Sequence, residues 1–116
     1  MTKILLGLIL FAAYSGVAQP AVKHGPDCSG GWPTNMAQAT LKNAGLLHYE
    51  EMDFTKTKTV RLASESLGKG LWHQVYLVTF FKRSGEEVQA VVVHDASKEE
   101  CSMTEPQVFA VSKRLP

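Results

Sequence analysis

The chain has 116 residues, 45% of them hydrophobic, and its 12 basic and 11 acidic residues leave a formal net charge of +1. This length predicts one small domain with a core of its own. Nucleic-acid binding depends on clustered Lys and Arg that neutralise phosphates, so the near-neutral charge argues against a nucleic-acid partner.

The first 18 residues have the pattern of a secretory signal peptide. Lys3 gives a positive start, residues 4–13 are apolar, and small residues follow up to Ala18. An apolar run this short does not comfortably cross a bilayer core of roughly 30 Å, so it predicts a cleaved signal over 1–18 rather than an anchor. We therefore expect a periplasmic or secreted protein with no stable membrane span after cleavage.

Two cysteines, Cys28 and Cys101, follow this segment. In an oxidising compartment, an even pair in a small exported domain predicts a disulfide. Closing so long a loop would restrict the unfolded chain by about 4 kcal/mol. Neither a Cys-x-x-Cys spacing nor a suitable His spacing supports a redox or metal function for the pair.

The remaining chain predicts an α+β fold. Residues 19–31 contain Pro and Gly without periodicity and predict an irregular lead-in to a single domain over 32–116. We expect one N-terminal helix packed on a four-stranded antiparallel β-meander and linked by the disulfide. The strands are predicted from alternating or β-branched runs at about 57–65, 71–81, 86–95 and 107–113.

The predicted helix follows Trp32 and is about ten residues long. Asn35 is placed as the N-cap with Gln38 as its capping-box partner, and Gly45 suits the left-handed position after the last turn. A narrow apolar stripe would pack on the sheet, and it consists of Ala37, Leu41 and Ala44.

The clearest strand pattern is a hairpin over 71–95. Both arms are rich in β-branched and aromatic residues, and Ser84-Gly85 between them is typical of a two-residue turn. Counting outward from that turn predicts these pairs: Lys82 with Glu87, Phe81 with Val88, Thr79 with Ala90, Leu77 with Val92, and Val75 with His94.

In this register both faces of the hairpin are apolar, and each needs a cover. The helix supplies one cover. The other face is either left for a partner or covered by the lead-in or a short helix over 46–52, and both alternatives stay open. The partner-binding candidates on that face are Trp72, Tyr76, Val78, Phe80, Val91 and Val93.

His73 and His94 share one face in the predicted register and would be diagonal neighbours, which makes them candidates for a metal site or proton relay. Without a third ligand, strand-borne His pairs are more often partly buried residues. The chain has no Gly-x-Ser-x-Gly nucleophile motif. We expect no enzyme, no catalytic residue, no metal and no cofactor, with a small-molecule or metal-binding protein or enzyme around these two His as the alternative.

The helix followed by a four-stranded meander resembles the cystatin arrangement in outline, and Gln74-Val75-Tyr76-Leu77-Val78 is similar to that family's Gln-x-Val-x-Gly hairpin. Val78 stands where the motif has Gly, so the family's inhibitory residues are not carried over.

The exported, disulfide-linked form is also similar to periplasmic immunity proteins that neutralise toxins attacking the cell wall. This resemblance implies a non-catalytic protein-binding module, an inhibitor or immunity protein that occludes a toxin or hydrolase. The loops at 66–70 and 96–104 are further candidates for filling the partner's cleft, and a homodimer is an alternative assembly.

Overall fold

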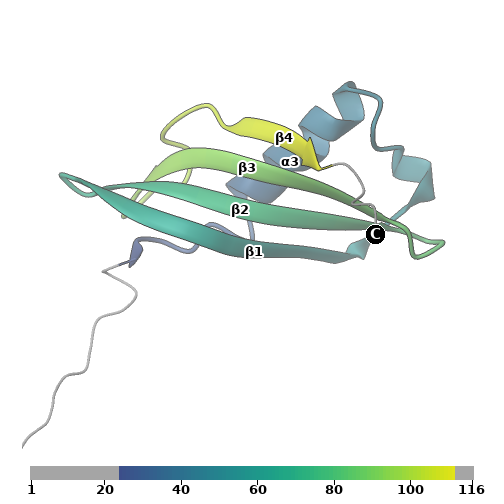
Figure 1. The fold of residues 1–116 in the computed structure, drawn as a ribbon, viewed down its shortest axis with the longest axis horizontal. Coiled ribbons are helices and arrows are strands. Elements are labelled where there is room, and N and C mark those ends of the chain that lie inside the picture. The colour runs from purple at the N-terminus through teal and green to yellow at the C-terminus, as the bar shows by residue number, and fades with distance from the viewer. Residues whose placement is uncertain (1–23, 112–116) are drawn as a thin grey trace, which may run out of the picture.

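The structure is a computed structural model that describes residues 24–111. The predicted signal segment, 1–18, lies outside the described residues. Within them the chain forms one α-helix and one four-stranded antiparallel sheet in the order β1-β2-β3-β4 (Figure 1). The expected α+β meander is therefore confirmed. The elements are α3 (Trp32–Asn43), the 3-10 helix η3 (Tyr49–Glu51), β1 (Met52–Gly68), β2 (Leu71–Lys82), β3 (Glu87–Ser97) and β4 (Gln107–Val111).

Helix α3 begins earlier than its predicted cap. The N-cap is Gly31 rather than Asn35, and Pro33 occupies the first turn, where a missing N–H costs no hydrogen bond. The helix ends as predicted, because Gly45 has a φ of +77° and its N–H donates to the Lys42 oxygen at 3.0 Å.

Strand β1 is much longer than the predicted 57–65. Its pairing with β2 runs from Met52, opposite Lys82, to Gly68, opposite Leu71, with register shifts along the way. Residues 55–59 are all Thr or Lys, so the first part of this strand shows no alternation of apolar and polar residues. Such residues are acceptable there because β1 lies at the edge of the sheet.

The hairpin register differs by one residue from the predicted one. Phe81 pairs with Glu87, Leu77 with Val91. The loop has three residues instead of two, since the Gly85 N–H donates to the Lys82 oxygen at 2.8 Å and the Lys82 N–H donates to the Glu86 oxygen at 2.8 Å. Gly85 takes the left-handed conformation, with a φ of +99°, that closes a three-residue loop.

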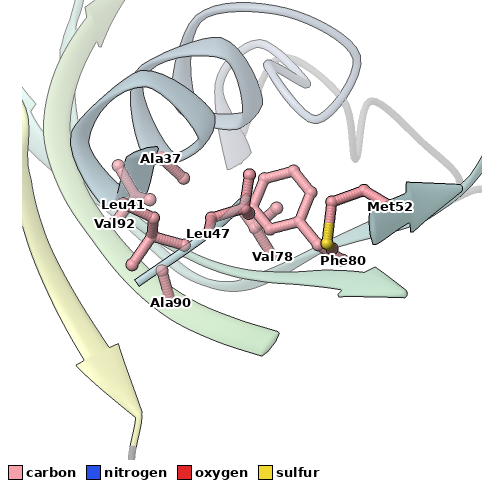
Figure 2. Close-up of a cluster of buried hydrophobic side chains, with 8 residues drawn as sticks. All are labelled: Ala37, Leu41, Leu47, Met52, Val78, Phe80, Ala90 and Val92. Atoms are coloured by element: carbon pink, nitrogen blue, oxygen red, sulfur yellow. The ribbon is translucent and has the colours of Figure 1, made fainter. Parts of the chain in front are cut away.

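A slip of one residue exchanges the faces of a whole strand. Trp72, Tyr76 and Phe80 of β2 therefore share a face with Val88, Ala90 and Val92 rather than with Val91 and Val93. Helix α3 covers this face, as Figures 1 and 2 show. The main buried cluster consists of Ala37, Leu41, Leu47, Met52, Val78, Phe80, Ala90 and Val92.

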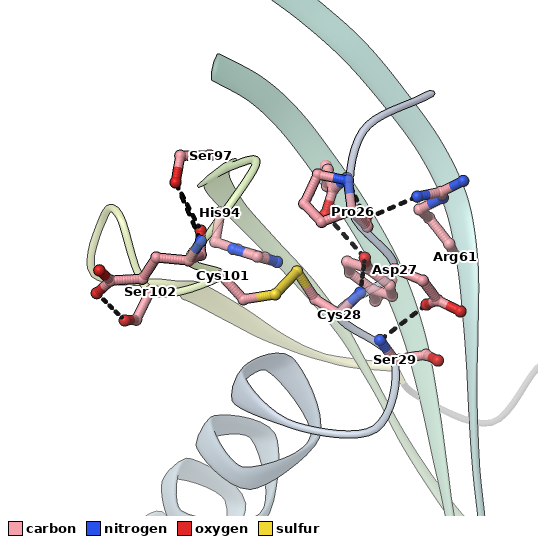
Figure 3. Close-up of a disulfide and its surroundings, with 12 residues drawn as sticks. Pro26, Asp27, Cys28, Ser29, Arg61, His94, Ser97, Cys101 and Ser102 are labelled. Atoms are coloured by element: carbon pink, nitrogen blue, oxygen red, sulfur yellow. Dashed lines mark hydrogen bonds between the residues drawn. A yellow bond between two sulfur atoms is a disulfide. The ribbon is translucent and has the colours of Figure 1, made fainter. Parts of the chain in front are cut away.

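The segment 24–31 packs on the same side as α3, toward the end of the sheet that carries the disulfide (Figure 3). Gly25 is buried and lies directly against the indole of Trp72. The lead-in is therefore a second cover for the helix-covered face, whereas the alternative left open by the sequence placed it over the opposite face.

We expect Gly25→Ala to lower the free energy of unfolding by about 1–3 kcal/mol. The φ of Gly25 is +77°, and an added Cβ would lie 2.6 Å from Cγ of Trp72. Gly30→Ala is the matched control, because nothing lies within 4 Å of its added Cβ. Urea denaturation followed by Trp fluorescence measures both variants, and equal losses would contradict the expectation.

Candidate interaction surface

The sheet face opposite α3 is apolar at its centre; we call it the open face. In Figure 1, α3 lies behind the sheet and no described element crosses in front of it. Pairing across the strands places one residue of each strand in a row. The central rows are Val60, Leu77, Val91 and Phe109, followed by Ala63, Val75, Val93 and Gln107.

The outer strands of the open face carry its most exposed apolar side chains. Val60 on β1 is 50% exposed, and Phe109 and Val111 on β4 are 53% and 41% exposed. The four aliphatic side chains between them on β2 and β3 are half-buried by their neighbours. A continuous apolar patch of this kind marks an interaction site more often than isolated exposed residues do.

Polar rows border this apolar centre on both sides. At one end, His73 pairs across the strands with Glu65 and Asp95, and its Nδ1 lies 2.6 Å from Oδ1 of Asp95. At the other end, Thr79 accepts a 2.9 Å hydrogen bond from Nε2 of Gln89. An apolar centre with a polar rim is the usual layout of a protein–protein interface.

The prediction that aromatic side chains of β2 form an exposed surface together with Val78 is wrong. Trp72, Tyr76, Val78 and Phe80 are buried, at 7% exposure for Trp72 and 0% for the others. They pack toward α3 and the lead-in, on the face that these two segments cover. Of the six partner-binding candidates, only Val91 and Val93 lie on the open face.

Sequence reasoning missed Val60, Leu77 and Phe109 as members of this surface. The signal was present, because all three lie in strands with alternating side chains. Only the correct register shows that they share a row with Val91.

The structure separates the two predicted neighbours His73 and His94. Gln74 pairs with His94, and His73 pairs with Asp95, so the two imidazoles lie on opposite faces. His94 is 2% exposed and stacks on the Tyr76 ring, with 5.5 Å between the ring centroids. Within residues 24–111, no group of three or more His, Cys, Asp or Glu side chains could hold a metal ion.

A buried polar network fastens the lead-in to the sheet, next to the Cys28–Cys101 disulfide, which is confirmed (Figure 3). The Tyr76 hydroxyl accepts a 2.9 Å hydrogen bond from the Cys28 N–H and donates one of 2.8 Å to Oε1 of Gln74. Nε2 of Gln74 in turn donates to the Pro26 oxygen at 2.9 Å. Burial raises the pKa of the Tyr76 hydroxyl, which keeps it a neutral donor in this structural network.

A shallow hollow at the β2–β3 turn is lined by charged side chains that already bind one another. Nζ of Lys82 lies 3.3 Å from Oε1 of Glu86 and 3.6 Å from Oε1 of Glu51, and the Arg83 guanidinium donates to the backbone oxygen of Glu50. These contacts raise the pKa of Lys82, the hydrogen bond and charge of Glu86 having the largest effect. These charged groups hold the β2–β3 turn against the segment before β1. The open face is therefore the stronger candidate for an interaction site.

Comparison of the chain with protein-family models, with curated proteins and with solved structures found no match. The site is therefore interpreted from its own geometry. The disulfide fits a protein of an oxidising compartment outside the cytoplasm. In the part of the chain that the structure describes, no helix has the length and apolarity needed to cross a membrane.

Proposed function

We propose that this chain is a non-catalytic protein-binding module, secreted or periplasmic, and that the open face is its interface with another polypeptide. The observation that carries the proposal is the apolar centre of a sheet face that no described element covers, while α3 and the lead-in seal the opposite face. Burial of apolar surface contributes roughly 25 cal/mol per Å², so a polypeptide that covers this face gains free energy.

The rigidity of the face supports the same function. Its side chains project from hydrogen-bonded strands, and the two inner strands are flanked on both sides. A surface that is already ordered loses little conformational entropy when a partner binds. The polar rows at each end of the face add hydrogen-bonding groups that select the partner and its orientation.

We expect Val60→Lys and Phe109→Lys each to weaken partner binding at least about thirtyfold, as central apolar contacts do when lost. Both side chains are about half exposed, so the substitutions leave the fold intact. Leu46→Lys is the matched control, because Leu46 is 51% exposed but lies outside the open face.

The partner is first identified by photo-cross-linking in cells from residue 109, with residue 46 as the control position. The cross-linked protein is then purified and its affinity for each variant is measured by calorimetry. A reconstituted partner that binds all three variants as tightly as the original chain would overturn the open face as the interface, as would adducts that are equal from both positions.

We further propose that the module is an inhibitor or immunity protein that occludes a toxin or hydrolase exported to the same compartment. The β1–β2 turn and the loop 98–106 lie at the same end of the sheet, because Leu71 pairs with Ser97. Leu67 and Met103 are exposed there, at 52% and 45%, and Cys101 anchors the loop. Apolar side chains on an anchored end suit insertion into a cleft.

The occlusion step is tested on the catalytic activity of an exported toxin or hydrolase that is cross-linked in cells from residue 103, in the loop after β3. One equivalent of the chain should suppress that activity, and the double substitution Leu67→Lys with Met103→Lys should restore it, while Leu46→Lys should not. A partner whose activity is unchanged by saturating amounts of the chain would overturn the inhibitor function and leave the binding function in place.

A further inference from the structure

We infer that the polypeptide on the open face is a second copy of this chain, packed face to face about a two-fold axis that runs across the strands. This inference rests on the proposed function, because it takes the open face as an interface. It is carried by the pattern of polar and apolar rows, which is complementary to itself in one orientation.

On β1, β2 and β3, four successive rows cross the open face in the order polar, apolar, apolar, polar, while β4 contributes Val111 to the first row and Gln107 to the third. The cross-strand register defines them. They are Lys58, Thr79, Gln89 and Val111; then Val60, Leu77, Val91 and Phe109; then Ala63, Val75, Val93 and Gln107; and finally Glu65, His73 and Asp95.

We place a two-fold axis between the two apolar rows and parallel to them. Each strand then lies over the same strand of the second copy, and the order of the rows is reversed. The two apolar rows then face one another, with Leu77 of each copy over Val75 of the other. Sheets packed in this way lie about 10 Å apart with their strands within about 30° of alignment. An isologous contact of this kind closes as a dimer.

The same axis brings opposite charges of β1 together on both sides of the apolar rows, and it also pairs polar groups of β3. Lys58 of each copy meets Glu65 of the other, and the amide of Gln89 meets the carboxylate of Asp95. Among the described residues, neither Lys58 nor Glu65 takes part in an ion pair within its own chain. Both charges are therefore available to the second copy, and each dimer gains the contact twice.

A two-fold axis along the strands gives a poorer match. It would place β1 over β4 of the second copy, so that Lys58 would face Val111. The Glu65 carboxylate would lie beyond Gln107, the first residue of β4, and would face no residue of that strand. Charge complementarity thus selects the axis across the strands.

The test is a charge exchange, measured by sedimentation equilibrium of protein made from the full-length chain under oxidising conditions. We expect a dimer at concentrations of about 1–100 μM. Lys58→Glu and Glu65→Lys should each weaken dimerisation at least about tenfold, because each creates two like-charge contacts. The double variant with both substitutions should regain the original dimerisation constant. Lys98→Glu is the control, since Lys98 is exposed in the loop after β3.

Thermal melting of each variant shows whether the domain stays folded. We expect it to do so, because Lys58 and Glu65 are both exposed. A monomer up to about 100 μM would overturn the dimer, as would a dimer that ignores both single substitutions or a double variant that stays weakened. If the chain is monomeric and residue 109 cross-links a different protein that binds on reconstitution, the proposed function stands without the dimer. If that cross-link is also missing, both fail.

Discussion

Replacement of Phe80 by Ala is expected to lower the free energy of unfolding by about 3–5 kcal/mol. Phe80 is completely buried between the sheet and the segment after α3, where Leu47 and Met52 belong to the same cluster (Figure 2). Its ring also packs edge-on against Phe54, with 6.2 Å between the centroids. The loss combines the transfer of the ring to water with the cavity left beneath the helix.

Phe109→Ala is the matched control for Phe80→Ala, because it removes the same ring from the open face. Phe109 is 53% exposed, and we expect a loss below about 1 kcal/mol. Urea denaturation followed by circular dichroism, at equal and low protein concentration, keeps association from contributing to the difference. Similar losses in the two variants would contradict the assignment of the two faces.

Removal of the disulfide by Cys28→Ala with Cys101→Ala is expected to cost about 4 kcal/mol of stability. The bond joins residues 73 positions apart, so it excludes many extended conformations from the unfolded chain. It also holds the lead-in, whose Cys28 N–H donates to Tyr76. For a small domain this is a large fraction of a total stability of about 5–15 kcal/mol.

The disulfide prediction is checked by chemical denaturation with and without reductant. The original chain in reductant should match the double variant, and the double variant should not respond to reductant. Hydrogen exchange should show the Cys28 amide losing protection before the core strands open. A loss below about 1 kcal/mol would mean that the unfolded chain is already restricted in the absence of the bond.

Much of the fold is predictable because its signals are local. The arms of the central hairpin, the position of α3 and its end at Gly45 each depend on a few neighbouring residues. The pairing of Cys28 with Cys101 is predictable because no other cysteine exists in the chain. Strand β1 is predicted only in part, because an edge strand needs no continuous apolar pattern.

The candidate site is less predictable, because its membership depends on the number of residues in the β2–β3 loop. Ser84-Gly85 fits a two-residue loop, whereas the structure uses three residues with Gly85 in the left-handed region. This change moves Val91 and Val93 away from Tyr76 and places them beside Leu77 on the open face. It also separates His73 from His94.

The amino-acid order alone predicts the fold class, the disulfide and an apolar sheet with more surface than one short helix covers. Each follows from local backbone preferences, from the count of cysteines or from composition. Which face stays open depends on how the segments pack, because side-chain alternation allows either face of the sheet to be buried. Tyr76 and Phe80 fill the space beneath α3 and the lead-in, and that packing leaves Val60, Leu77 and Phe109 to the solvent or to a partner.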